Sequence, residues 1–358
     1  MSKNQSTLFL SFDDIKEIIH QVGIDQLMDD MIFDIESAFK SYDITKTTTP
    51  KRSGFNYEKP YVGLLEWMPL LKVEDEIMLK IVGYHPENPN QHNLPTILSS
   101  LTNYDINTGR LKSIMDGTFL TAMRTGAASA VATKYMALSD SKTLGLIGCG
   151  AQAITQLHAL SRIYTFESVL VYDTDNETLN SFEERCKALD LEAKITKTSI
   201  SSILEQSDII STATSIGVGE GPLFNTFETK PWLHINAVGS DFPNKIELPL
   251  SFLKQSFVCP DYKEQAFIEG ECQQLPENEI KEDIVGLINN IEKYKYIQQE
   301  TTVFDSTGWA LEDYISQKLI IKYAQKFELG NYVDVEYKPE DSKNPYHFLK
   351  VNKLAELS

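Results

Sequence analysis

A glycine-rich turn is the first feature of this sequence whose residue types and spacing could do chemistry. Residues 148–153 read GCGAQA, which has the form G-x-G-x-x-A, between the apolar run KTLGLI and the helical pattern AQAITQLHALSRI. Gly148 permits a tight strand-to-helix turn, Gly150 lets the backbone approach a pyrophosphate, and Ala153 packs closely between helix and strand. Free N–H groups at the helix start would bind phosphates. This context favours a dinucleotide site over a plain turn.

An acidic residue follows the next expected strand. The run VYDTD places Asp173 25 residues after Gly148. An acid at this point accepts hydrogen bonds from the adenosine ribose. No Lys or Arg follows directly, and the neighbouring Asp175 and Glu177 would repel a 2′-phosphate. The sequence therefore predicts NAD rather than NADP, and the alternative for Asp173 is a turn or helix N-cap residue.

Three charged side chains stand in surroundings that are otherwise apolar. Glu66 lies in LLEWMPLL, Lys80 in IMLKIVG and Arg124 in the Ala-rich run LTAMRTGAA. Buried charges are costly unless they are paired or bind a ligand. Two or three cations that converge make a clamp for a carboxylate. An internal ion pair between Glu66 and Lys80 is the alternative.

One carboxylate follows a predicted strand of the nucleotide-binding sheet. Asp241 comes directly after LHINAVGS. Groups just past the carboxyl ends of such strands face the ligand crevice, so Asp241 is a candidate acid–base residue. Capping of a turn before Pro243 is the alternative.

The elements that must position these residues fall into two patterns. We expect a helix over 12–41, short strands in 61–70, 76–84 and 94–105, a hairpin turn at 105–109, and a helix over 118–138 interrupted near Gly126. From 142 to 307 strands alternate with helices, which implies a parallel sheet covered on both faces. The expected strands there are 143–148, 168–173, 208–215, 233–240, 256–261 and 301–306. Another helix is predicted over 309–327, and the last 30 residues carry no assignment.

Length, charge and composition limit the number of domains and the classes of partner that this protein could have. The 358 residues correspond to about two domains. The net charge of −18 argues against binding to nucleic acid or anionic membranes. The four cysteines and six histidines show no metal-ligand spacing, so no metal is expected. The first residues, MSKNQSTLFLSFDD, do not resemble a signal peptide, and no apolar stretch is long enough for a membrane span. We therefore expect a cytoplasmic protein.

Eight runs together resemble the ornithine cyclodeaminase/μ-crystallin family, and within it the cyclodeaminase branch. They span nearly the whole chain: LEWMP (65–69), LKIVGYHPENP (79–89), TAMRTGAAS (121–129), LIGCGAQA (146–153), VYDTD (171–175), HINAVGSDFPNK (234–245), IEGECQQLP (268–276) and TVFDSTGWALEDY (302–314). The resemblance implies an α/β protein with a doubly wound Rossmann-type parallel sheet inserted in a split α+β substrate-binding and dimerisation domain. The expected division is 1–125 and 309–358 for the split domain and 126–308 for the NAD-binding domain.

The resemblance also implies the conversion of L-ornithine to L-proline and ammonia by a homodimer or a higher homo-oligomer. Hydride transfer from Cα to NAD⁺ gives an imine, the terminal amine attacks C2, ammonia leaves, and the hydride returns. Carried over residue by residue, the substrate-binding set is Arg52, Glu66, Lys80, Arg124, Asp241 and Thr307, with Asp241 catalytic. The NAD-binding set is Thr96, Arg124, Gly148, Gly150, Ala151, Gln152, Asp173, Thr214, Ile235, Asn236, Ala237, Val238, Lys245 and Ser306.

Three other functions stay open at the level of sequence. A net amino-acid dehydrogenase or imine reductase would release NADH. A cyclodeaminase for lysine or another diamino acid would differ in pocket depth. A non-catalytic, crystallin-like NAD-binding protein would need neither the three cations nor Asp241.

Overall fold

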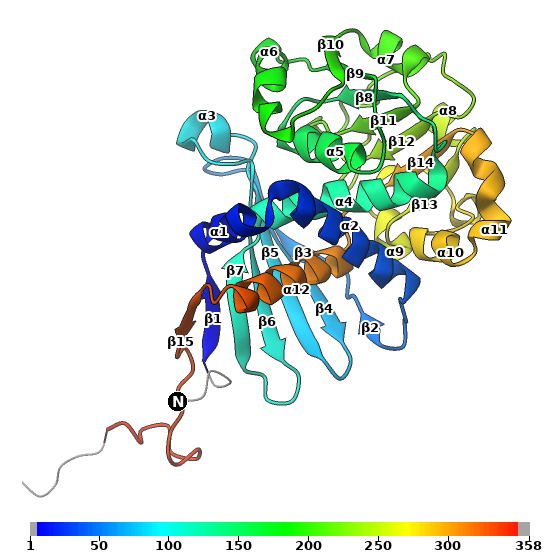
Figure 1. The fold of residues 1–358 in the computed structure, drawn as a ribbon. Coiled ribbons are helices and arrows are strands. Elements are labelled where there is room, and N and C mark those ends of the chain that lie inside the picture. The colour runs from blue at the N-terminus through cyan, green and yellow to red at the C-terminus, as the bar shows by residue number, and fades with distance from the viewer. Residues whose placement is uncertain (1–5, 350–358) are drawn as a thin grey trace, which may run out of the picture.

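The structure, a computed structural model, describes residues 6–349 and contains two β-sheets (Figure 1). Residues 1–5 and 350–358 lie outside the described residues. They include the beginning of the run MSKNQSTLFLSFDD, which does not resemble a signal peptide, and the end of the expected segment 309–358. Within residues 6–349 the first sheet has eight strands and the second has seven.

The first sheet carries the short strands expected in the N-terminal third. Its order is β15-β1-β7-β6-β5-β4-β2, with β3 also paired to β4. Pairing is antiparallel except between β1 and β7. The strands are β1 (Thr7–Leu10), β2 (Thr47–Thr48), β3 (Ser53–Tyr57), β4 (Gly63–Lys72), β5 (Glu76–Tyr84), β6 (Ile97–Asp105), β7 (Leu111–Asp116) and β15 (Asn331–Val333). The predicted turn at 105–109 joins β6 to β7, with Gly109 at a φ of 74°.

Helices cover the inner face of the first sheet, and α12 contacts both β4 and β5 (Figure 1). The helices of this part of the chain are α1 (Phe12–Val22), α2 (Ile24–Lys40), α3 (Asn88–His92), α4 (Thr118–Met136) and α12 (Ala310–Lys326). The single helix expected over 12–41 is divided at Gly23, where φ is 87°.

The expected interruption of α4 near Gly126 is wrong. The helix is continuous, because Gly126 serves close packing rather than a break. A Cβ at Gly126 would lie 2.4 Å from the carbonyl oxygen of Thr155 in the neighbouring α5. The expected boundary between 125 and 126 falls inside this helix.

The second sheet is parallel throughout, as the alternating pattern predicts. Its order is β10-β9-β8-β11-β12-β14-β13. The strands are β8 (Thr143–Ile147), β9 (Ser168–Tyr172), β10 (Lys194–Lys197), β11 (Ile209–Thr212), β12 (His234–Ala237), β13 (Phe257–Pro260) and β14 (Thr302–Asp305). The helices are α5 (Ala151–Ser161), α6 (Asn176–Arg185), α7 (Ile200–Gln206), α8 (Leu250–Leu253), α9 (Lys263–Ala266), α10 (Ile284–Asn289) and α11 (Ile291–Tyr294).

The strand order places a ligand crevice in the second sheet. The chain runs outward from β8 in both directions, to β9 on one side and to β11 on the other. Ligands of open parallel sheets bind beyond the carboxyl ends of the strands at such a reversal. The doubly wound α/β fold expected from the sequence is confirmed. No helix among residues 6–349 is long and apolar enough to cross a membrane.

Candidate active site

The glycine turn has the geometry that a pyrophosphate requires. Gly148 has a φ of 91°, and a Cβ there would lie 2.5 Å from the carbonyl oxygen of Ala213, so only glycine fits. A Cβ on Gly150 would meet no atom within 4 Å, so the space beside it is open. Gly150 is also the N-cap of α5 and provides no side chain to satisfy the helix N–H groups. The N–H groups of Ala151 and Gln152 are therefore available to an anion.

Asp173 lies immediately after β9, as expected, and contacts the glycine turn. Its Oδ2 accepts a hydrogen bond from the backbone N–H of Cys149 at 2.7 Å, and its Oδ1 accepts one from Asp175 at 2.8 Å. Asp175, not Asp173, caps α6. Asp173 thus ties the end of β9 to the glycine turn, and its contact with a ribose stays a prediction.

A buried carboxylate that the sequence did not reveal organises the loops after β11 and β12. Glu247 is fully buried and accepts hydrogen bonds from Thr212, from the backbone and hydroxyl of Thr214, and from the N–H of Gly239. These bonds fix Thr214, a predicted NAD contact, at the edge of the crevice.

The other predicted NAD contacts are distributed over the ends of the strands. Ile235, Asn236 and Ala237 are buried within β12, and the amide of Asn236 donates to Thr133 at 2.9 Å. Their side chains therefore belong to the protein interior, and Val238 is the first residue beyond the strand. The remaining three lie in loops: Thr96 directly before β6, Lys245 in the segment between β12 and α8, and Ser306 directly after β14.

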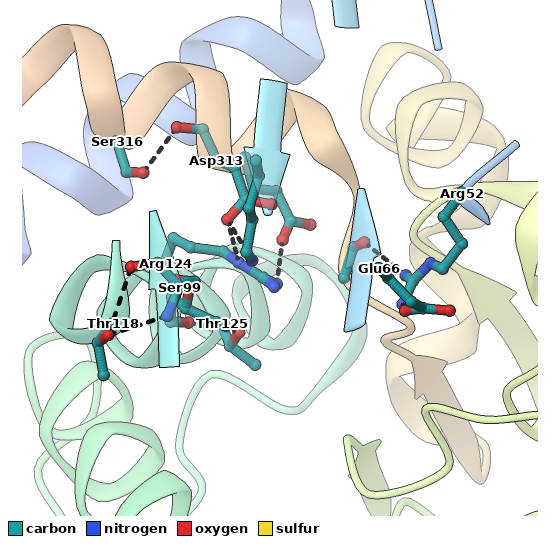
Figure 2. Close-up of polar contacts among 12 residues, drawn as sticks. Arg52, Glu66, Ser99, Thr118, Arg124, Thr125, Asp313 and Ser316 are labelled. Atoms are coloured by element: carbon teal, nitrogen blue, oxygen red, sulfur yellow. Dashed lines mark hydrogen bonds and ion pairs between the residues drawn. The ribbon is translucent and has the colours of Figure 1, made fainter. Parts of the chain in front are cut away.

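Lys80 and Arg124 come together on one carboxylate of α12. Nζ of Lys80 lies 2.9 Å and Nε of Arg124 lies 3.0 Å from the same Oδ1 of Asp313. Nη1 of Arg124 lies 2.9 Å from Oε2 of Glu312. All four side chains are buried. Figure 2 shows Arg124 and Asp313 pointing toward one another between α4 and α12.

Arg52 approaches the same region from the start of β3. Its Nη2 donates to the carbonyl oxygens of Thr307 at 2.7 Å and Gly308 at 3.0 Å. Its Nε lies 2.9 Å from Oε1 of Glu269, and its Nη1 lies 3.7 Å from Oε2 of Glu66 (Figure 2). The alternative ion pair between Glu66 and Lys80 does not form; Glu66 pairs with Arg52 and Lys80 with Asp313.

Gly308 is the point at which Arg52 and Arg124 come close to the same residue. It has a φ of 86°, and a Cβ there would lie 2.7 Å from Nη2 of Arg124. Its carbonyl oxygen is held by Arg52, and its N–H donates to Oδ2 of buried Asp261 at 2.7 Å. Burial, together with the positive charges of Arg124 and Arg52, lowers the pKa of Lys80 to about 8 against the opposing charge of Asp313. Such a concentration of cations could bind a carboxylate.

Carboxylates adjoin this cluster next to Arg52. Burial raises the pKa of Glu66, and it raises that of Glu269 to about 7. The negative charge of Asp241 contributes to both shifts, so the three carboxylates share one electrostatic environment. Asp241 lies beyond β12, with a side chain 39% exposed and 2.9 Å from Nζ of Lys245. The arrangement could hold a cationic group.

The hydroxyl of Thr307, predicted to touch the substrate side chain, is directed elsewhere. It donates to Oδ1 of Asp261 at 3.0 Å, and Thr307 is buried. The backbone of Thr307 contributes instead, through the carbonyl that receives Arg52.

The matches to known proteins extend over nearly the whole chain. The model of the ornithine cyclodeaminase/mu-crystallin family matches residues 13–327. The chain belongs to this family. It is 37% identical to an L-lysine cyclodeaminase of Streptomyces rapamycinicus, over 93% of this chain and 97% of that protein. It is 27% identical to an ornithine cyclodeaminase of Agrobacterium tumefaciens, over 95% and 93%.

Solved structures similar to this chain share the fold, and several of them contain NAD⁺ or NADH. A lysine cyclodeaminase structure, described as recognising L-lysine, L-ornithine and L-2,4-diaminobutyric acid, has a TM-score of 0.91, 41% identity and coverage of 96% of this chain and 99% of that one. An archaeal alanine dehydrogenase dimer with bound NAD has a TM-score of 0.81, 28% identity and coverage of 92% and 100%. NAD is the cofactor of this family, and the glycine turn, the uncapped start of α5 and Asp173 fit it.

Several residues of the family site escaped sequence reasoning. Asp313 and Glu312 lie within the run WALEDY, and neither acid is among the predicted site residues. Asp261, Glu269 and Glu247 are further buried carboxylates. The sequence signal that could have indicated these carboxylates is an acidic residue in a largely apolar stretch, as at Glu66. No group of three or more His, Cys, Asp or Glu side chains in residues 6–349 could hold a metal ion.

Proposed function

We propose that this protein is an NAD-dependent cyclodeaminase that converts L-ornithine to L-proline and ammonia. The observation that carries the proposal is that cations and carboxylates act on one another in one region, since Arg52, Lys80 and Asp241 all affect the pKa of Glu66. Lys80, Arg124 and Arg52 suit the carboxylate of an amino acid. Glu66 and Asp241 stand on the side where a distal ammonium would lie. A simple amino acid such as alanine has no second cation for these carboxylates.

The residues divide the proposed reaction between them. The cation clamp, defined here as Arg52, Lys80 and Arg124, holds the α-carboxylate and so orients Cα toward the crevice. The chemistry that bound NAD supplies is reversible hydride acceptance from Cα, without net oxidation. A distal ammonium resembles that of lysine, with an ordinary pKa of about 10.4, and must lose a proton before it attacks. Asp241 orients this ammonium and relays its proton.

Ring closure exchanges one carbon–nitrogen bond for another. The distal nitrogen forms a bond to C2, the bond between C2 and the α-nitrogen breaks, and ammonia leaves. Because both ends of the substrate are held, the attack is intramolecular with a high effective molarity. Lys80 and Arg124 are buried, so little water reaches these two members of the clamp.

L-Lysine is the second candidate substrate. The lysine cyclodeaminase relative is 37% identical to this chain, against 27% for the Agrobacterium ornithine cyclodeaminase. Lysine carries the same two charged ends, separated by one more methylene group.

We also propose the division into an NAD-binding domain, 126–308, and a split substrate-binding and dimerisation domain, 1–125 and 309–358.

A single assay separates these functions. Purified protein with NAD⁺ and L-ornithine should yield proline and ammonia in equal amounts, with no accumulation of NADH. The same assay with L-lysine should yield the six-membered cyclic amino acid if lysine is preferred. Stoichiometric NADH would make the protein a net dehydrogenase, and retention of NAD without turnover of either diamino acid would overturn the proposal.

The outer face of the first sheet supports a homodimer. Leu65, Ile77, Ile81 and Leu98 are between 37% and 40% exposed on adjacent strands. Phe55 is 64% exposed and packs edge-on against Trp67. Contiguous apolar surface of this kind marks an interaction face, and a second copy of the chain would cover it sheet against sheet.

The substitution Ile81→Glu should therefore convert a dimer to a monomer. A charge at the centre of a buried sheet–sheet contact is left without a partner, whereas in the monomer the site is solvated. Light scattering coupled to size exclusion would measure the mass. Phe33→Glu, at a 68% exposed position on α2, is the control and should leave the dimer intact. A wild-type monomer, or a dimer unaffected by Ile81→Glu, would contradict this assignment.

A further inference from the structure

Asp313 is a buried carboxylate that contacts two members of the cation clamp, Lys80 and Arg124. It lies in the first turn of α12 and is 1% exposed. One of its oxygens, Oδ1, receives both Nζ of Lys80 from β5 and Nε of Arg124 from α4. The other oxygen, Oδ2, is buried without a hydrogen-bond partner. A single carboxylate oxygen therefore joins three elements at the clamp (Figure 2).

The shared oxygen fixes the separation of the two cations. Both nitrogens lie within 3.0 Å of the same atom, so Lys80 and Arg124 are held side by side in the interior. Like charges at this distance repel strongly when water is excluded. The negative charge of Asp313 offsets this repulsion.

The two cations depend on Asp313 to different degrees. Arg124 has a second carboxylate partner, Glu312. For Lys80, Asp313 is the one ion-pair partner within 4 Å among residues 6–349. These ion pairs fix the direction in which the remaining N–H groups of Lys80 and Arg124 point. Nη2 of Arg124 faces Gly308.

We propose that Asp313 is the positioning residue of the clamp, which orients Lys80 and Arg124 toward the substrate carboxylate and supplies the counter-charge that lets them lie together. The proposal rests on the proposed function only for the identity of the substrate. Any α-amino acid presents the same carboxylate to the clamp.

The pH dependence of binding distinguishes this role from simple packing. The charged groups that act on Lys80 are Asp313 on α12, Arg124 on α4 and Arg52 before β3, and Lys80 in turn acts on Glu66 of β4. Glu312 on α12 pairs with Arg124. Burial lowers the pKa of Lys80 to about 8, and the charge of Asp313 opposes that shift. Without this charge Lys80 loses its proton at lower pH. Carboxylate binding should then fail at lower pH too.

The test compares Asp313→Asn, Asp313→Glu and Ser316→Ala in the NAD-loaded full chain. Asparagine keeps the size of the side chain but removes its charge. Glutamate keeps the charge and moves it by one methylene group. Ser316 is on the same helix, donates only to the backbone carbonyl of Asp313, and serves as the control. The readouts are kcat and KM for L-ornithine across pH about 6 to 9.5, together with the Kd for NAD.

We expect Asp313→Asn to raise KM about tenfold or more and to move the alkaline limb of kcat/KM to lower pH, with NAD affinity within about twofold of wild type. Asp313→Glu should raise KM but return the alkaline limb to the wild-type position. Ser316→Ala should match wild type in both. An unchanged KM and alkaline limb in Asp313→Asn would overturn the proposal, as would a reduction in kcat alone.

Two further outcomes have defined meanings. If Asp313→Asn does not fold, Asp313→Glu carries the test, because an unchanged KM in that variant would overturn the proposal. If the wild type turns over no diamino acid, the proposed function fails, and binding of L-proline to the NAD-loaded protein by calorimetry replaces KM. Loss of that binding in Asp313→Asn would support the positioning role, and equal binding would overturn it.

Discussion

Replacing Asp241 by asparagine is expected to lower kcat by about 10²- to 10⁴-fold while NAD remains bound. The carboxylate of Asp241 lies beyond β12, is 39% exposed, and contributes to the negative field at Glu66 and Glu269. It is the site carboxylate most accessible to a substrate ammonium. Asparagine has nearly the same shape but can neither accept the proton nor balance the positive charge.

Single-turnover and steady-state formation of proline would measure this loss, and fluorescence titration would measure NAD affinity. Asp190→Asn provides a matched control, because Asp190 lies far from the clamp in a left-handed conformation with a φ of 45° that asparagine tolerates. It should leave kcat unchanged. An Asp241→Asn enzyme with wild-type turnover would remove Asp241 from the mechanism.

The substitution Arg124→Met is expected to abolish substrate binding and also to destabilise the fold. It removes the shared partner of Glu312 and Asp313, which are buried on α12. Removal of one member of a buried charged network costs about 3–5 kcal/mol. The loss of a carboxylate ligand should lower kcat/KM by at least about 10²-fold. Thermal unfolding and steady-state kinetics would measure the two effects.

The stability loss should depend on pH with a defined sign. Burial raises the pKa of Glu312 from 4.5 to about 8, despite the opposing charge of Arg124. The folded protein therefore retains a proton that the unfolded chain releases, and stability falls as pH rises from 4.5 toward 8. Without Arg124 the pKa of Glu312 rises further. The decline in stability then extends to higher pH, and Arg124→Met loses the most stability at alkaline pH.

A double variant and a surface control separate the two effects. Arg124→Met with Glu312→Gln removes the orphaned acid, so part of the stability should return while activity stays lost. Lys134→Met, on the same helix, breaks a 2.8 Å pair with Glu36 from a side chain that is 49% exposed. It should cost about 0–1 kcal/mol. Equal losses of stability in Arg124→Met and Lys134→Met would contradict a buried charge network around Arg124.

Local sequence patterns were sufficient for the nucleotide half of the molecule. The turn at Gly148 and Gly150 and the acid at Asp173 are specified by residues that are close in the chain, and the structure places them at one crevice. Parallel buried strands have continuous apolar runs, which made six of the seven strands visible. The exception, β10, has the polar sequence KITK at the edge of the sheet, where one side is unpaired and the pattern is weak.

Elements that depend on distant partners were not predictable in the same way. The strands β1 and β15 are four and three residues long, and they pair with one another across nearly the whole chain. Gly126 indicated a helix break by its propensity, yet tertiary packing against α5 keeps the helix continuous.

The sequence by itself determined the fold class, the NAD turn and the fact that Lys80 and Arg124 are buried cations in need of a partner. Only the tertiary structure decided which partner they have. Asp313 is 233 residues from Lys80, and Arg52 reaches the carbonyl of Thr307 from 255 residues away. The cost of burying a charge is a local property, readable from the apolar residues on either side. The charge that balances it is chosen by the packing of β5, α4 and α12, which no local pattern encodes.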